Sequence, residues 1–307
     1  MNDAEALYRV ARIGHAIKDP ESAHLTLSHH RVASQHTVPG LKVKVQERPD
    51  AVEVAIRVEE GARIGKPVHL CFGMLPESGI QRILLSVEAG PGSRIEIYAH
   101  CVFPNAVRVK HLMEGVIRIG EGAEYTYRER HLHSPQGGVE VYPQARVELA
   151  RGARFHTDFE LLQGRVGLID IDYSATGGPE SVLEMLARIS GSGDDAIRIR
   201  EKAHLAGEEA RGVLTSRVAV RERAAAEVYN EMLATGARAR GHVDCKEIIR
   251  DNGRAKAVPV VEVGHPTAHV THEAAIGSVD SRQLSTLMAR GLTEEEAVNL
   301  ILEGLLS

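Results

Sequence analysis

The sequence predicts a mainly β protein that folds as a solenoid of short strands, and two observations predict it. The first is a repeat in which a glycine is followed by a small residue, at intervals of 31, 30 and 30 residues. The second is an alternation of apolar and polar residues before these glycines, as over residues 52–58 and 83–87. The repeats begin at Gly61, Gly92, Gly122 and Gly152, and residues 236–239 carry a later copy.

Each repeat has a simple structural interpretation. Alternation with a period of two is typical of a half-buried strand, and the glycine marks the turn that follows it. Strands that recur at a fixed period indicate coils that stack and share one core. A β-sandwich also contains evenly spaced strands, but its turns have no reason to keep one period, so we favour the solenoid. The aromatic content of 4% suits narrow coils filled by aliphatic side chains.

The two ends differ from this repeating core, which we place at residues 37–277. Residues 1–36 are expected to form an N-terminal helical segment, because apolar residues over 6–17 follow helical spacing. Residues 278–307 are expected to form a helical hairpin. Asp280-x-x-Gln283 and Thr293-x-x-Glu296 both fit capping boxes, and Gly291 lies between the two helices. This hairpin fits either a cap on the solenoid or a docking surface.

Composition excludes several classes of function. The net charge of -5 provides no basic surface for nucleic acid. No apolar run approaches the length of a membrane span, and residues 1–20 lack the apolar core of a signal peptide. Three widely spaced cysteines are typical of the reducing cytoplasm rather than of a disulfide framework. No P-loop or dinucleotide fingerprint is present, so we do not expect this chain to bind ATP through such a loop.

The last quarter of the chain contains three potential metal ligands. Cys245 is followed 27 residues later by His272 and Glu273, and thiolate, imidazole and carboxylate all bind borderline metals. If one coil spans 28–30 residues, these side chains lie near each other on adjacent coils, about 4.8 Å apart along the stack. A zinc hydrolase signature would place a second histidine at position 276, where this chain has Ile276.

A second set of ligands has the period of the repeat. Cys71, Cys101 and His131 are spaced by 30 and 30 residues, which predicts a ladder along one face of the solenoid. Cys71 lies in an apolar run, where a thiol also serves simply to fill space. Cys101 follows His100 and precedes His111 by ten residues, so its surroundings are more polar.

Several motifs in this sequence resemble one known family. Residues 241–245 (GHVDC), 257–259 (AVP), 270–277 (VTHEAAIG) and 288–297 (MARGLTEEEA) resemble the C-terminal core of the SufB/SufD family of iron–sulfur cluster assembly scaffold proteins. Cys101-Val102-Phe103-Pro104, followed by His111, resembles a second motif of that family. The resemblance covers roughly residues 40–307, and it points to a single-subunit SufB/SufD-like type.

The resemblance implies a fold and a set of partners. The family fold is a right-handed parallel β-helix with helical ends. Members pair through their β-helices and bind an ABC-type ATPase, SufC, through the C-terminal helical region. An iron–sulfur cluster is assembled transiently at the interface of the pair with sulfur from a donor protein. The chain is therefore expected to be a cytoplasmic scaffold without enzymatic activity of its own, paired with a second copy of itself or with a paralogue.

The resemblance also assigns roles to individual residues. Cys245 matches the SufB cysteine at the cluster-forming interface, His272 the SufD histidine there, and Glu273 a neighbouring SufB carboxylate. Cys101 matches the SufB cysteine that receives sulfur, and His131 falls near polar positions that line the sulfur path through the β-helix.

This sequence departs from SufB proteins in two ways. It lacks their N-terminal cysteine motif and longer N-terminal region, and a lysine of the sulfur path is replaced near Ala145. Both departures concern sulfur delivery rather than the interface residues.

Two other functions remain open on sequence grounds. One is a mononuclear metal-dependent enzyme that uses the C-terminal Cys/His/Glu cluster. The other is a passive β-solenoid adaptor that docks a partner through its C-terminal hairpin. Neither alternative accounts for the resemblance to assembly scaffolds. We therefore take the assembly scaffold as the leading hypothesis.

Overall fold

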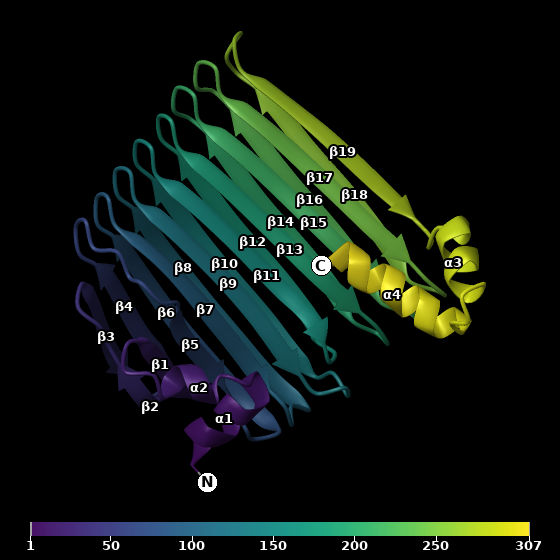
Figure 1. Ribbon diagram of the computed structural model, residues 1–307, viewed down its shortest axis with the longest axis horizontal. Coiled ribbons are helices and arrows are strands. Elements are labelled where there is room, and N and C mark those ends of the chain that lie inside the picture. The colour runs from purple at the N-terminus through teal and green to yellow at the C-terminus, as the bar shows by residue number, and fades with distance from the viewer. Residues whose placement is uncertain (1, 307) are drawn as a thin grey trace.

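The structure is a computed structural model that describes residues 2–306, and it forms a flattened β-solenoid of about eight turns (Figure 1). The strands are β1 (His24–Ser28), β2 (Arg31–His36), β3 (Leu41–Glu47), β4 (Val52–Val58), β5 (Val68–Gly73), β6 (Ser78–Ala89), β7 (Arg94–Phe103), β8 (Arg108–Ile119), β9 (Glu124–His133), β10 (Val139–Leu149), β11 (Arg154–Gln163), β12 (Gly167–Gly177), β13 (Val182–Gly191), β14 (Ala196–Leu205), β15 (Arg211–Val220), β16 (Ala225–Ala234), β17 (Arg240–Ile249), β18 (Arg254–Val263) and β19 (His269–Gly277). The predicted solenoid is confirmed.

From β4 onward, successive strands alternate between two facing sheets. Sheet A has the order β19-β17-β15-β13-β11-β9-β7-β5-β1-β2, and sheet B has the order β18-β16-β14-β12-β10-β8-β6-β4-β3. Neighbours pair in parallel except at the N-terminal end, where β1 with β2 and β3 with β4 are antiparallel. Side chains alternate between the two faces of each strand. The inward positions of both sheets therefore meet in one apolar core that runs the length of the solenoid.

The repeated glycines occupy the turns at one end of the coils. Each adopts the left-handed conformation, and its N–H donates to a carbonyl in the next coil, as from Gly61 to Pro91 at 2.8 Å. Only glycine adopts this conformation without a steric cost. The same backbone conformation continues in later coils at the non-glycine residues Glu180, Glu209 and Arg238, the last of which lies in the 236–239 copy of the repeat. The structural period therefore outlasts the glycine pattern.

The N-terminal helices pack on the outer face of sheet A. They are α1 (Asp3–Ala11) and α2 (Gly14–Ile17). Leu7 and Ala11 of α1 pack with Cys71, Val102 and Leu132 from β5, β7 and β9. The helical part is shorter than the expected 1–36 segment. Residues 24–36 form β1 and β2, because β1 continues the parallel ladder of β5 into the first coil.

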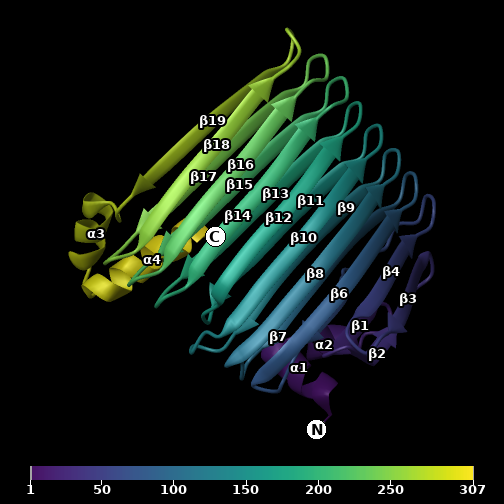
Figure 2. The same cartoon turned by 180° about the vertical axis from the view of Figure 1, so that it is seen from behind.

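The C-terminal hairpin is formed by α3 (Ser281–Met288) and α4 (Glu294–Leu306), as predicted. The side chain of Asp280 accepts hydrogen bonds from the N–H groups of the first turn of α3, and Thr293 and Glu296 form the capping box of α4. Val298 and Leu302 of α4 pack near Ala219 on the outer face of sheet A. Both helical ends therefore lie on sheet A, and Figure 2 shows that no helix of residues 2–306 covers the outer face of sheet B.

The C-terminal end of the solenoid is open. β18 and β19 are the last strands of their sheets, and each has a partner on one side only within the described residues. Three side chains that point inward here are exposed: Val263 on β18, and His272 and Ile276 on β19. Val263 is 48% exposed and Ile276 is 45% exposed. The core of the solenoid thus reaches solvent at this end.

Among the helices of residues 2–306, none is both long and apolar enough to cross a bilayer.

Candidate functional site

Polar side chains form a column inside the otherwise apolar core. They occupy inward positions of strands in both sheets and extend from β7 to β17. Charged and polar groups are rarely buried unless they have partners or a function. The interior column includes Cys101, His111, Glu129, His131, Thr157, Tyr173, Glu201, Ser216, Asn230, Cys245 and Glu247.

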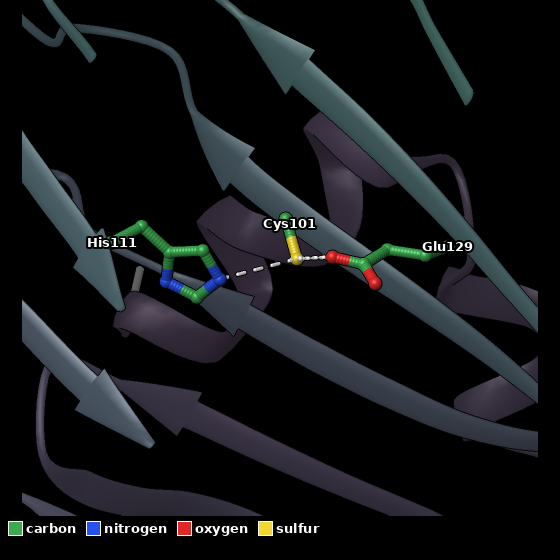
Figure 3. Close-up of side chains that lie close together, drawn as sticks. All are labelled: Cys101, His111 and Glu129. Atoms are coloured by element: carbon green, nitrogen blue, oxygen red, sulfur yellow. Dashed lines mark hydrogen bonds between the residues drawn. The ribbon is translucent and has the colours of Figure 1, made fainter. Parts of the chain in front are cut away.

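The first part of the column gathers a thiol, an imidazole and a carboxylate (Figure 3). Cys101 lies on β7, Glu129 on the neighbouring β9, and His111 on β8 of the opposite sheet. The sulfur of Cys101 lies 3.6 Å from Nε2 of His111 and 3.6 Å from Oε1 of Glu129. One ligand atom from each of the three residues lies within 4.8 Å of the other two. All three side chains are buried.

Two more histidines extend this group toward the edge of the coil. His131 lies beside Cys101 in the ladder between β7 and β9, so this step of the predicted ladder is confirmed. Its Nε2 atom lies 2.8 Å from Oε1 of Glu129, and its Nδ1 atom lies 3.1 Å from Nε2 of His133. His133 in turn lies 3.2 Å from the carbonyl oxygen of Arg165, to which it can donate. A continuous hydrogen-bonded chain therefore runs from the carboxylate to the turn after β11.

Burial controls the ionisation of this group. Burial raises the pKa of the Cys101 thiol well above its usual range, and the Glu129 carboxylate adds to the effect. Burial lowers the pKa of His111 to about 3, with a smaller contribution from His131. Since the thiolate is the nucleophile and the metal ligand, Cys101 needs a nearby positive charge or a proton acceptor before it reacts.

Cys71 does not join the ladder. The register pairs Cys71 with His100 and Phe72 with Cys101, so the coil at this point spans 29 residues. A shift of one residue moves a side chain to the other face of its strand. Cys71 therefore lies outside the core, beneath α1, where it packs with Leu7. The predicted ladder is therefore wrong at Cys71, and the thiol there fills space among apolar side chains.

The middle of the column lies on sheet B. Tyr173, Glu201 and Asn230 are successive partners in the ladder of β12, β14 and β16. The Tyr173 hydroxyl donates to Oε2 of Glu129 at 3.3 Å, which joins this part to the first group. Burial raises the pKa of Glu201 to about 8. Its Oε2 atom has no hydrogen-bond partner within residues 2–306. Glu201 is therefore protonated and neutral near pH 7.

The column ends at Cys245 on β17. The Cys245 side chain is fully buried and accepts a contact of 3.6 Å from the side-chain amide of Asn230. Ser216 and Cys245 are direct partners in the ladder between β15 and β17, and Ser216 also donates to Glu247 at 3.5 Å. Burial raises the pKa of the Cys245 thiol. Only the last coil separates this thiol from the open end of the solenoid.

A single chain does not gather the three predicted interface ligands. The register pairs Cys245 with Ala274 and Val243 with His272, because this coil spans 29 residues rather than 27. His272 shares the inward face with Cys245 but lies in the exposed last strand. Glu273 faces outward, where its carboxylate lies 3.8 Å from Nζ of Lys246. Within residues 2–306, the one such set of three ligands is Cys101, His111 and Glu129.

The sequence interpretation missed most of the interior column, although a signal was present. Glu201 follows Ile197 and Ile199 in the apolar phase of its strand, and Asn230 likewise follows Val228. A carboxylate in the phase of buried aliphatic residues predicts an unusual interior group. The strand pattern does not predict how far apart the two sheets lie, and this spacing places His111 beside Cys101.

Comparison with known proteins identifies the family. Residues 77–305 match the family described as SUF system FeS cluster assembly, SufBD core domain. The chain belongs to the SufBD family. A curated SufBD relative described as an iron-sulfur cluster assembly protein, from Pyrococcus horikoshii, is 34% identical over 92% of this chain and 86% of its own length. Another from Methanocaldococcus jannaschii is 33% identical over 87% of this chain and 84% of its own length.

Similarity to some other SufBD proteins is confined to a short region. A SufBD family protein from Staphylococcus saprophyticus is 35% identical over 81 residues, which are 25% of this chain and 17% of the relative. The resemblance inferred from the C-terminal motifs is thus confirmed, and the chain is a SufBD-type iron–sulfur cluster assembly protein.

Proposed function

We propose that this SufBD chain is the scaffold of a SUF-type complex that builds a nascent iron–sulfur cluster between two chains. Cys245 is the thiolate ligand, and His272 and Glu273 supply mixed nitrogen and oxygen ligands. The cluster is cargo that leaves the scaffold, and mixed ligands hold it less firmly than four thiolates. The second chain is another copy or a paralogue, and the complex works in the reducing cytoplasm, consistent with three free cysteines.

The observation that carries the proposal is the interior column that ends beside an open edge. It connects Cys101 to Cys245 through polar side chains, within a core that is otherwise apolar. In the proposal, Cys101 accepts sulfur from a donor protein and His131 belongs to the path. Glu201 and Asn230 line the route past Ala145, where the expected lysine is absent. A neutral Glu201 does not repel an anionic sulfur species.

The open end supports the pairing of two chains. β18 and β19 offer unpaired edges and exposed apolar side chains, which natural proteins usually cover. A second chain on this end brings two copies of each ligand around one axis. This arrangement supplies ligands that one chain does not gather. Since Cys245 is buried in the single chain, we further propose that the last coil shifts when the cluster forms.

The C-terminal hairpin is the proposed docking surface for a SufC-like ABC ATPase. The side chains of Met288 and Leu300 are 43% and 47% exposed, and within the described residues α3 buries no side chain. The ATPase supplies the ATP hydrolysis, so the scaffold itself needs no enzymatic activity. Met288→Glu and Leu300→Glu are expected to abolish binding to the purified ATPase. Val116→Glu, on the exposed outer face of sheet B, is the matched control and should bind normally.

Anaerobic reconstitution with ferrous iron tests the site. With free sulfide, Cys245→Ala should hold little cluster by absorbance and iron content, whereas Cys71→Ala and Cys101→Ala should resemble wild type. With a cysteine-derived persulfide donor and a reductant that supplies two electrons per sulfur atom, Cys101→Ala should also fail, because the proposed sulfur acceptor is gone. If Cys245→Ala holds as much cluster as wild type, the assignment of the interface ligand is wrong.

A further inference from the structure

The geometry points to a metal-ion site inside the solenoid, separate from the proposed cluster interface. We propose that Cys101, His111 and Glu129 bind one divalent transition-metal ion, Fe²⁺ or Zn²⁺, between the two sheets. The inference does not rest on the proposed sulfur route, which needs Cys101 but not a bound metal. It also does not involve Cys245, His272 or Glu273.

Two of the three separations between the ligand atoms match a tetrahedral site. With a metal–sulfur bond of about 2.3 Å and metal–nitrogen or metal–oxygen bonds of about 2.0–2.1 Å, a tetrahedron separates sulfur from each other ligand by roughly 3.5 Å. The Cys101 sulfur lies 3.6 Å from Nε2 of His111 and 3.6 Å from Oε1 of Glu129. Two edges of the tetrahedron are therefore already formed, and the third pair of atoms lies within 4.8 Å.

Hydrogen bonding alone explains this arrangement poorly. A thiol is a weak hydrogen-bonding group with a single proton, yet the Cys101 sulfur lies 3.6 Å from both Nε2 of His111 and Oε1 of Glu129. His111 is fully buried, and its Nδ1 atom has no hydrogen-bond partner in the described part of the chain. Nε2, which faces the Cys101 sulfur, is therefore the ring atom of His111 that is placed to bind an ion.

The charges also balance around a divalent ion. A thiolate and a carboxylate carry two negative charges, and a neutral imidazole adds none, so a divalent ion makes the buried group neutral overall. Burial of unpaired charge is costly, and neutrality removes most of that cost. The donor set of sulfur, nitrogen and oxygen suits Fe²⁺ and Zn²⁺ better than Mg²⁺ or Ca²⁺.

The surrounding side chains hold the ligands in place. The Phe103 ring packs on His111 with centroids 5.1 Å apart, and the Phe159 ring packs on His131 at 4.8 Å. His131 and Tyr173 both contact the Glu129 carboxylate, at 2.8 Å and 3.3 Å. A carboxylate ligand that is itself hydrogen-bonded to a histidine is a common outer shell of metal sites. Three protein ligands leave a fourth coordination position for an exchangeable ligand.

Cobalt binding to the full chain tests the proposal. The variant Cys71→Ser/Cys245→Ser retains Cys101 as its one cysteine, so a thiolate-to-cobalt charge-transfer band reports on that residue alone. We expect one Co²⁺ per chain with a tetrahedral spectrum. Adding His111→Ala to this variant should weaken binding at least about tenfold, because loss of a ligand costs more than loss of an outer-shell partner. His204→Ala, which changes a half-buried histidine on the outer face of sheet B, is the control and should bind as before.

Competition with Fe²⁺ under anaerobic conditions and with Zn²⁺ shows which ion the site prefers, and displacement of Co²⁺ by either ion supports the proposal. Binding should also raise the unfolding temperature of the parent variant but not of the His111→Ala variant. Glu129→Gln provides a second variant if His111→Ala does not fold. Anomalous X-ray scattering from wild-type crystals grown with Zn²⁺ gives an independent measurement, with a peak expected beside the Cys101 sulfur.

Two results would overturn the proposal: no thiolate-to-cobalt band in the variant with Cys101 alone, or unchanged binding after His111→Ala. The same His111 variant separates this site from the proposed function. It should lose the metal ion yet retain cluster assembly from free sulfide at Cys245.

Discussion

Glu201 provides a sharp test of the interior column, because its burial couples the stability of the fold to pH. The side chain lies inside the solenoid, and burial raises its pKa from 4.5 to about 8. Between these two values the folded state keeps the proton and the unfolded state loses it. Stability contributed by this group is therefore present below pH 4.5 and is lost as the pH rises toward 8.

The size of the effect follows from the pKa shift. Between the two pKa values, each unit of pH lowers the free energy of unfolding by about 1.4 kcal/mol. The free energy of unfolding therefore falls by about 3 kcal/mol from pH 5 to pH 7. Glu201→Gln has nearly the same shape and cannot ionise. We therefore expect the variant and wild type to have similar stability at pH 5, and the variant to be more stable by about 3 kcal/mol at pH 7.

Urea unfolding followed by circular dichroism at both pH values measures this difference. Comparing the two proteins at each pH cancels the contributions of other groups, including the buried histidines, whose pKa values are lowered. Glu227→Gln, an exposed change on the neighbouring strand β16, is the matched control and should show no such pH dependence. A stability difference between Glu201→Gln and wild type that is the same at pH 5 and pH 7 would refute the argument from burial.

Two further predictions concern the attachment of the C-terminal helix. Arg188 donates to the carbonyl of Leu306 at 2.8 Å and pairs with the buried carboxylate of Asp158 at 2.8 Å. Arg188→Met should destabilise the chain by about 3 kcal/mol, the lower end for a broken buried pair, since Arg128 remains 3.7 Å from Asp158. Faster hydrogen exchange over 294–306 should accompany it, and unchanged exchange there contradicts the role of Arg188 as an anchor. Thr293→Ala should cost roughly 1 kcal/mol by removing the cap of α4. Exchange in its first turn should rise, and equal exchange in both proteins counts against the cap.

The local features of the fold were predictable from the sequence because they depend on neighbouring residues. Gly122 and Gly152 mark turns, since glycine adopts their left-handed backbone conformation without a steric cost. The capping box at Thr293 and Glu296 involves residues only three apart, so the hairpin was placed correctly. The C-terminal motifs likewise identified the family before any contact was known.

The candidate sites required the register between coils. Cys71 and Cys101 are spaced by 30 residues, yet one sits beneath α1 and the other inside the core. Coil length here varies by a residue or more, and a single-residue change reverses the face of a strand. For the same reason, Cys245 and Glu273 do not come together within one chain as the sequence predicts.

By itself, the sequence determined the repeating solenoid, its helical ends and the family, since these follow from local conformation and from motifs along the chain. Only the tertiary structure decided which polar residues share the interior. His111 reaches Cys101 across two facing sheets, and Tyr173 joins Glu129 from residues 44 positions away. Such contacts depend on the stacking of coils and on the narrow space between the sheets. No pattern within one strand predicts either of these.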